Sequence, residues 1–413
     1  MPPAASSRYE SLDLWRGVAC LLVVVCHSTE IGAASVPRDR LIHSGGSLWD
    51  WLIHVSLEGR LGVPIFFVIS GYCIAASAES VRRGSHGTGS FFLRRFRRIY
   101  PPYWIVLAGT AVIVEVLPAT WLPAQIPGGT LAPPQWAGAV TLTEEWRPLL
   151  GGPPKRHFLN HSWTLCYEEQ FYAVVGVILL VARRWFYPSV AAVTALTYLN
   201  VTDLNALVGS RLGLDLNRFQ FAAPGTFISG LWLAFAAGVA VYYWLTRATS
   251  FQKRMIAVVL LGGTAWAAQP LSGLLTNNAT LSKCLVVAFL FAFVLLGLHR
   301  CDRRMSAARV FAPLQFCGRM CYSLYLVHAP LCWVLSWALY RNGLNSPAPT
   351  LLITLPVCLV TSVIAGYAFH RGVERHFLNS SRPKCTAPVE TAPARPAEEA
   401  ARKVGSGLIR LPA

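Results

Sequence analysis

The chain has 413 residues, of which 54% are hydrophobic and only 13% are charged. Soluble globular proteins have about 25% charged residues, so this chain lacks the charge needed to cover a water-facing surface. The net charge is +17, but the arginines stand in short segments between apolar blocks, where membrane topology explains them better than nucleic acid does. The composition argues against a soluble enzyme or a nucleic-acid-binding protein, and it predicts one integral membrane domain in a lipid bilayer.

Apolar blocks of about 20 residues, the length that crosses a hydrocarbon core of about 30 Å, recur from residue 12 to residue 369. We predict an all-α polytopic bundle of about ten transmembrane helices, with a further short helix at Trp49–Leu57. The predicted domains are a cytoplasmic N-terminus at 1–11, a membrane domain at 12–377 and a disordered cytoplasmic tail at 378–413. The predicted spans are 12–32, 61–78, 100–117, 165–182, 185–201, 228–246, 255–273, 283–299, 322–340 and 350–369.

Lysine and arginine are distributed unevenly between the two sides of this topology. With both termini in the cytoplasm, the inner segments hold 25 of the 36 Lys and Arg residues, as the positive-inside rule requires. Asp13 and Arg16 interrupt the first apolar block, so we expect a retained helix and not a cleaved signal peptide. The outer loops 118–164 and 202–227 are long enough to line an acceptor site.

The 11 cysteines lie mostly inside the apolar blocks, where they behave as small hydrophobic residues. The chain contains no CxxC pair and no Cys/His spacing typical of a metal site. We therefore expect neither a bound metal nor an obligatory disulfide.

The first apolar block contains Arg16 and His27. Ionisable groups inside a membrane cost about 2.5–3.5 kcal/mol each on insertion scales, so those that remain point to function. Eleven residues of α-helix rise about 16 Å and return to nearly the same face, which puts Arg16 near the cytoplasmic end and His27 deep inside. A histidine packed between helices is the structural alternative, but the alignment with Arg16 favours proton transfer by His27.

A second polar cluster, Asn160–Tyr172, carries the adjacent carboxylates Glu168 and Glu169 into an apolar block. Neighbouring helix positions point about 100° apart, so one of the two faces a given cavity. That carboxylate would orient His27 as in a catalytic triad. The alternative is a pair of interfacial carboxylates that end the helix.

A third cluster places four arginines before a predicted span, on the cytoplasmic side. A basic cluster at this position commonly anchors anionic lipid. The functional alternative is a phosphate-binding patch, because guanidinium groups bind phosphate in a bidentate manner, and coenzyme A carries several phosphates. The four residues are Arg94, Arg95, Arg97 and Arg98.

Taken in order, these clusters resemble acyltransferase family 3, a family of bacterial integral membrane proteins, over residues 9–377. Each motif alone is weak, but six motifs in the right order are specific. They are Leu12–Gly17 with the Arg-x10-His spacing to His27, Gly62–Tyr72, the arginine cluster with Pro101 and Tyr103, Ser162–Tyr172, Tyr322–Pro330, and Glu374-Arg375.

The resemblance implies a ten-helix transferase of the bacterial inner membrane. Such enzymes pass an acyl group, usually acetyl, from cytoplasmic acyl-CoA to a hydroxyl on a carbohydrate or other small acceptor across the membrane, without a permanently bound cofactor. By position, His27 matches the essential histidine, Arg16 its motif partner, Arg95 and Arg98 the cytoplasmic arginines, Glu168 the carboxylate and Ser70 the small polar residue of the second span.

Two positions depart from the family pattern: Pro64 replaces a common acidic residue, and His376 replaces a common proline. Two other functions are compatible with the sequence. A secondary transporter would use the intramembrane His, Glu and Arg residues as a proton relay, although the chain has no evident inverted repeat. A non-catalytic membrane scaffold would tolerate substitution of Arg16 and His27.

Overall fold

The computed structural model describes residues 9–34, 46–84, 87–117, 122–126, 131–151, 153–202, 224–269 and 279–378. These residues form helices joined by turns, with no β-strand among them. Met1–Phe377 make one compact unit. The predicted tail and most of the predicted outer loop 202–227 lie outside the described residues.

Each of the ten predicted spans overlaps a helix, although the end of the span 255–273 lies outside the described residues. The short helix predicted at Trp49–Leu57 is present as α3 (Leu48–Leu57). Within the described part of the chain, seven helical segments are long and apolar enough to cross a membrane by length and composition. The prediction of an all-α polytopic bundle is confirmed. The ten helices are α1 (Leu12–Ala33), α4 (Gly62–Arg82), α5 (Thr88–Val116), α7 (Trp163–Val181), α8 (Phe186–Val201), α10 (Trp232–Thr246), α11 (Ser250–Ala267), α12 (Ala279–Leu298), α15 (Cys321–Arg341) and α17 (Leu355–Phe369).

Helix ends differ from the prediction where charged residues continue a helix beyond its apolar block. Helix α5 begins at Thr88, well before residue 100, so the four predicted arginines lie inside the helix and not ahead of it. Arginine is a good helix former, and nothing in 88–99 stops the helix. Helix α4 likewise continues to Arg82 and includes Glu79.

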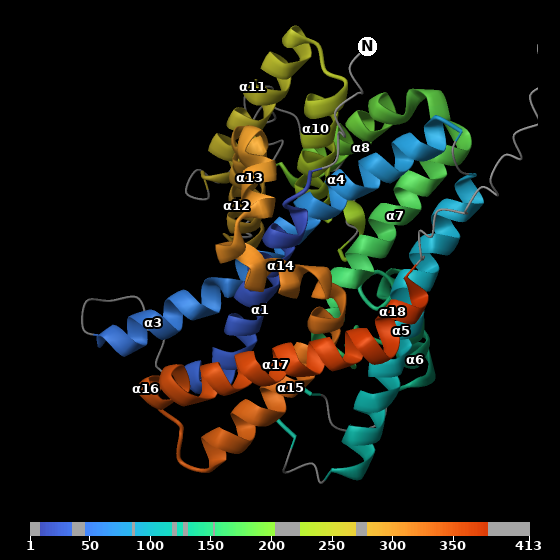
Figure 1. Cartoon of the computed structure of the whole chain (residues 1–413). Coiled ribbons are helices and arrows are strands. Elements are labelled where there is room, and N and C mark those ends of the chain that lie inside the picture. Colours follow the sequence, from blue (N-terminus) through green and yellow to red (C-terminus); the bar gives the residue numbers. More distant parts are fainter. Residues whose placement is uncertain are drawn as a thin grey trace, which may run out of the picture. The chain divides into compact units, whose positions relative to one another are not determined.

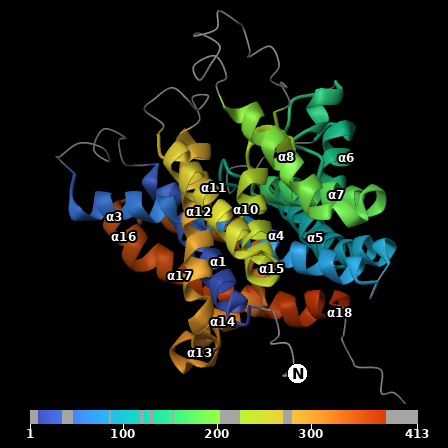
Figure 2. The same ribbon diagram turned by 90° about the horizontal axis from the view of Figure 1, so that it is seen from above.

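Helix α1 packs against α4, α15, α17 and the short α14 (Ala312–Arg319). Figures 1 and 2 show it running between these helices within the first unit. The C-terminal helical stretch runs beside α15: its first turn, α16 (Pro347–Pro349), contacts α3, and its last, α18 (Arg375–Phe377), contacts α5. Helix α1 also contacts α3, so partner helices cover much of its length and leave polar side chains such as Asp13 and Glu30 partly exposed.

Two reciprocal glycine pairs bring helix backbones into contact. A Cβ atom at Gly71 of α4 would collide with the carbonyl oxygen of Phe235 in α10, and one at Gly238 of α10 would collide with the carbonyl of Val68 in α4. Small residues at such crossings are typical of membrane helix pairs, because they let backbones approach closely. Gly17 of α1 and Gly318 of α14 make a similar pair.

Candidate active site

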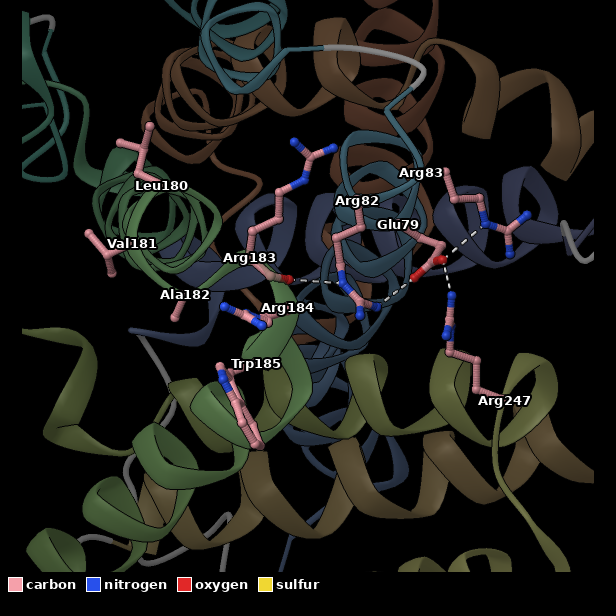
Figure 3. Close-up of a pocket in the computed structure, with 10 residues that line it drawn as sticks. All are labelled: Glu79, Arg82, Arg83, Leu180, Val181, Ala182, Arg183, Arg184, Trp185 and Arg247. Carbon is pink, nitrogen blue, oxygen red and sulfur yellow. Dashed lines mark hydrogen bonds and ion pairs between the residues drawn. The ribbon is translucent and has the colours of Figure 1, made fainter.

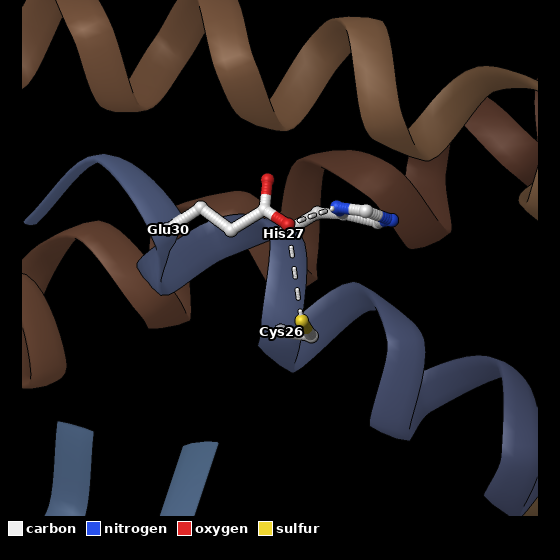
Figure 4. A group of neighbouring side chains, drawn as sticks. All are labelled: Cys26, His27 and Glu30. Atoms are coloured by element: carbon white, nitrogen blue, oxygen red, sulfur yellow. Dashed lines mark hydrogen bonds and ion pairs between the residues drawn. The ribbon is translucent and has the colours of Figure 1, made fainter. Parts of the chain in front are cut away.

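His27 lies on α1 with a carboxylate one turn further along the same helix. Its Nδ1 atom is 3.1 Å from Oε1 of Glu30, and Figure 4 shows the two side chains side by side with Cys26. The second oxygen of Glu30 accepts a hydrogen bond of 2.7 Å from Nε1 of Trp333 in α15. The His27 side chain is 18% exposed, so it is enclosed but still open to a small reactant.

Two more histidines surround His27. The imidazole of His328 on α15 lies 5.3 Å from that of His27, between ring centroids, and 5.6 Å from that of His161. Nδ1 of His328 lies 2.6 Å from the carbonyl oxygen of Tyr325, so it must donate, which makes Nε2 an acceptor. That Nε2 and both ring nitrogens of His161 have no hydrogen-bond partner among the described residues. The imidazoles of His27, His328 and His161 thus form a row, and the last two carry ring nitrogens that have no partner among the described residues.

Tyr325 fixes the start of α7 to α15. Its hydroxyl donates a hydrogen bond of 2.6 Å to the carbonyl oxygen of His161 and lies 2.9 Å from Oγ1 of Thr164. His161 belongs to a single 3₁₀ turn, Asn160–Ser162, that leads into α7. This contact holds His161 at the level of His27.

Glu168 lies in a separate polar cluster. Oγ of Ser70 donates to Oε1 of Glu168 over 2.7 Å and lies 3.0 Å from the hydroxyl of Tyr172, which also donates to Glu168. The guanidinium of Arg95 stacks 4.9 Å above the ring of Tyr172. The structure therefore brings together three of the predicted residues: Ser70, Glu168 and Arg95.

The prediction that Glu168 or Glu169 orients His27 does not agree with these contacts. Glu168 follows His161 by seven residues, about 10 Å along a helix axis, so it lies well away from the level of His27. Glu169 points to another face of α7, against Tyr100. The carboxylate that contacts His27 is Glu30.

Arg16 lies near the Glu168 cluster and not beside His27. It forms an ion pair of 2.8 Å with Asp13 and donates to the thiol of Cys73 over 3.0 Å. Cys73 is three residues from Ser70 on α4 and so lies on the same face of that helix. Arg16 and His27 thus mark two levels of α1, as their spacing predicts.

The four predicted arginines of α5 do not converge on one point. Arg95 reaches the Glu168 cluster and donates to Oγ of Ser77 over 3.4 Å. Arg98 lies near the thiol of Cys321, which also has Arg16 as a neighbour. Arg97 is exposed, and Arg94 is half-buried. Successive residues of a helix point in different directions, so this run contributes two inward-facing arginines.

A row of polar side chains connects the two levels. Thr164 is one turn before Glu168 on α7, and it contacts Tyr325, which is one turn before His328 on α15. Residues three or four apart on a helix share a face. The row therefore runs from the cluster of Arg95 and Glu168 to the histidines.

A buried charge cluster supports the histidine end from the loop before α7. His157 lies 3.1 Å from Glu144 and 2.7 Å from Glu145. Burial lowers the pKa of His157, but the hydrogen bonds and charges of the two carboxylates outweigh it and raise the pKa to about 9. Oγ of Ser162, next to His161, donates to Glu144 over 3.1 Å. This part of the predicted outer loop is therefore packed against the site.

Two groups of side chains bring possible metal ligands within 4.8 Å of one another: Cys26, His27 and Glu30, and Glu144, His157 and Cys166. In the second group both ring nitrogens of His157 face carboxylates, so the ring acts as a paired cation and not as a metal ligand. In the first group the thiol of Cys26 donates to the carbonyl oxygen of Leu57. The expected absence of a metal remains a prediction.

Sequence reasoning missed Glu30, His328, His161 and Trp333. Glu30 had a signal, since it stands three residues after His27 on the same helix. His161 and His328 were quoted only as members of motifs. Trp333 had no local signal, because its role depends on how α15 packs against α1.

The family model described as an acyltransferase domain matches residues 9–370 of the chain. No solved structure matches the chain. The chain is 25% identical to acyltransferase MdmB of Streptomyces mycarofaciens, over 94% of this chain and 97% of MdmB. It is 25% identical to the exopolysaccharide production protein ExoZ of Rhizobium meliloti, over 78% and 91% of the two chains.

The chain is also 29% identical to the peptidoglycan O-acetyltransferase OatA of Listeria monocytogenes, over 31% of this chain and 21% of OatA. The family model covers nearly the whole described membrane unit, including the histidine row and the Glu168 cluster. These matches, together with the multi-pass helical fold, establish that the chain belongs to acyltransferase family 3.

Proposed function

We propose that this membrane acyltransferase moves an acyl group, most simply acetyl, from cytoplasmic acyl-CoA to a hydroxyl of a carbohydrate or other small acceptor on the outer side of the bacterial inner membrane. The observation that carries the proposal is the His27–Glu30 pair at one end of a polar row that begins at Arg16, Arg95 and Glu168. We expect the thioester arm of the donor to follow this row between the apolar helices. The O-acetyltransferase name of OatA supports acetyl as the group.

His27 has the environment of a general base. Oε1 of Glu30 lies 3.1 Å from Nδ1 of His27, and we expect it to keep the proton on that nitrogen during the reaction, so that Nε2 accepts the second proton. The hydrogen bond from Trp333 fixes the carboxylate. A carboxylate held in this way also stabilises the imidazolium that forms when Nε2 takes the proton.

In direct transfer, Nε2 of His27 removes the proton from the acceptor hydroxyl while its oxygen attacks the thioester carbonyl carbon. A C–O bond forms, the C–S bond breaks, and the thiolate of coenzyme A takes the proton from the imidazolium. In the two-step alternative, Nε2 attacks the thioester carbonyl carbon, the C–S bond breaks and coenzyme A leaves as its thiolate. The acceptor oxygen then forms the C–O bond of the ester, the N–C bond to His27 breaks, and the hydroxyl proton passes to the thiolate. His328 and His161 supply further polar atoms beside either intermediate.

The donor side is assigned by charge. The inner segments predicted from the distribution of Lys and Arg adjoin the Arg16 and Arg95 end of the row, and their guanidinium groups suit the phosphates of coenzyme A. Arg94, Arg95, Arg97 and Arg98 remain candidates for that contact, with Arg95 and Arg98 facing inward. The packed outer loop around His157 then adjoins the acceptor side.

The test uses everted membrane vesicles, whose cytoplasmic face is outward, from cells with and without the gene. Labelled acetyl-CoA is added and the extracted glycan and small-molecule fractions are counted. We expect label that depends on the gene and is released by mild base, as an O-acetyl ester is. Equal label in both preparations would contradict the proposal, and the transporter alternative predicts further that coenzyme A gives the purified protein no thermal stabilisation.

A further inference from the structure

A second basic site lies at the C-terminal ends of α4 and α7, and none of the arginines of α5 lines it. A pocket of about 730 Å³ opens there, shown in Figure 3, with five arginines and a single glutamate on its walls. The arginines come from three segments that the charge distribution assigns to the cytoplasmic side. They are Arg82, Arg83, Arg183, Arg184 and Arg247.

Glu79 organises this pocket from a buried position, with 3% of its side chain exposed. It pairs with Arg82 over 2.9 Å and with Arg83 over 3.0 Å, and it also pairs with Arg247. A carboxylate has about four lone-pair sites and each guanidinium has five donors, so most of the donors have no partner in Glu79.

The remaining arginines are held without being neutralised. Arg183 donates to the backbone carbonyl of Val81, and Nε of Arg82 donates to the carbonyl of Arg183 over 3.1 Å. Arg184 is exposed, with no ion pair among the described residues. Five cations against one carboxylate leave a surplus of four positive charges in one pocket, and like charges held together repel.

Apolar surface adjoins these cations. Trp185 is 64% exposed and Val181 is 79% exposed, and both line the pocket. A phosphate relieves the charge repulsion through bidentate contacts with guanidinium groups, and the exposed indole suits an aromatic or apolar group attached to it. The pocket thus has the chemistry for an amphiphilic phosphate and not for a free inorganic ion alone.

We propose that this pocket binds a phosphate group carried on a larger molecule at the cytoplasmic face. Two molecules share that chemistry: an anionic phospholipid, through its headgroup, and a nucleotide such as coenzyme A, through its 3′-phosphate. The pocket is distinct from Arg94–Arg98, and only the coenzyme A source rests on the proposed function.

The test compares binding by the wild-type protein, Arg83→Gln/Arg184→Gln and a matched control, Arg304→Gln/Arg309→Gln. The control removes two exposed arginines outside the pocket. The pocket variant leaves Glu79 paired with Arg82 and Arg247, and its melting temperature in detergent checks that it folds. The single variant Arg184→Gln, which breaks no ion pair, is measured in parallel.

One arm measures the dissociation constants of coenzyme A and 3′-dephospho-coenzyme A, which differ by one phosphate. The other counts phosphatidylglycerol and phosphatidylcholine retained by the purified protein in native mass spectrometry. In one of the two arms we expect the double variant to reduce the wild-type preference for the phosphorylated or anionic ligand about tenfold. That preference is for coenzyme A over 3′-dephospho-coenzyme A, or for phosphatidylglycerol over phosphatidylcholine. Arg184→Gln should reduce it less, and the control should leave it unchanged. The arm in which the preference falls shows whether the phosphate bound in the pocket belongs to coenzyme A or to an anionic phospholipid.

Unchanged preferences in both arms for a folded double variant would overturn the proposal. Because only binding is measured, that outcome would leave acyl transfer by the His27 site untouched. Conversely, if the acetyl-transfer experiment failed, a preference for phosphatidylglycerol that depends on the pocket arginines would still support phospholipid binding.

Discussion

Glu30 is the acidic side chain in contact with His27, and Trp333 holds its second oxygen. We expect Glu30→Gln to lower kcat for acetyl transfer by about 10²-fold or more, because an amide cannot stabilise an imidazolium as a carboxylate does. Rates are measured as release of coenzyme A thiol from acetyl-CoA in the presence of acceptor. Glu115→Gln, at an exposed carboxylate of α5, serves as the control. If Glu30→Gln kept the wild-type rate, a residue other than Glu30 would have to orient His27.

His157 makes a prediction about pH. Its pKa of about 9 in the fold lies above the ordinary value near 6.5. A histidine with a raised pKa stabilises the fold fully below pH 6.5 and loses that contribution as the pH rises through 9. The contribution is on the order of 3 kcal/mol.

The melting temperature of the wild-type protein should therefore fall between pH 6.5 and 9.5 by several degrees more than that of His157→Gln. His376→Gln, at an exposed histidine near the end of the described chain, should keep the wild-type pH dependence. If the melting temperatures of the wild type and His157→Gln fell in parallel with pH, the ion pairs of His157 with Glu144 and Glu145 would not stabilise the fold.

At the residue scale, the sequence was informative about His27, Arg16, Ser70 and Glu168, because ionisable or polar residues inside apolar blocks are rare. The sequence predicts Glu168 or Glu169 as the partner of His27, whereas in the structure the carboxylate in contact with His27 is that of Glu30. Glu30 was within reach of local reasoning from its i, i+3 spacing. The contacts of His27 with His328 and Trp333 join residues about 300 positions apart, and no local pattern encodes them.

At the scale of helices, the α4–α10 crossing depends on glycine. We expect Gly238→Val to abolish or strongly reduce folded protein, because its Cβ would meet the backbone of Val68, which cannot move aside as a side chain does. Gly109→Val in α5 is the matched control, since nothing lies within 4 Å of a Cβ there. Yield and melting temperature are compared by size-exclusion chromatography and thermal unfolding in detergent. Equal behaviour of the two variants would argue against the close crossing.

The existence of the helices followed from the length of apolar blocks, which a membrane dictates. Their ends did not, as α5 shows: its apolar block begins near residue 100 but the helix begins at Thr88. Charged residues extend a membrane helix into water at little cost, so hydropathy alone does not mark where it ends.

For the whole molecule, both termini are proposed to lie in the cytoplasm. Cys301 is exposed in the segment between α12 and α14, and Leu150 is 75% exposed in the loop before α7. In intact cells we expect a membrane-impermeant maleimide to label a Leu150→Cys variant and to spare Cys301 until the cells are permeabilised. Peptide mass spectrometry assigns the labelled site, and the reverse pattern would invert the donor and acceptor faces.

The arginine pocket illustrates what only the folded chain reveals. Its residues come from the ends of α4 and α7 and from the turn after α10, and in the sequence each group reads as an ordinary positive-inside signal. Glu79, which joins three of them, is a single acidic residue with no motif around it.

The most direct test of the account is acetyl transfer by purified His27→Ala protein in proteoliposomes with labelled acetyl-CoA. Removing a general base or a covalent nucleophile should lower the rate by about 10²–10⁴-fold, while the fold, monitored by its melting temperature, persists. We expect that loss of rate in the folded variant. Transfer of label by His27→Ala at the wild-type rate would contradict it.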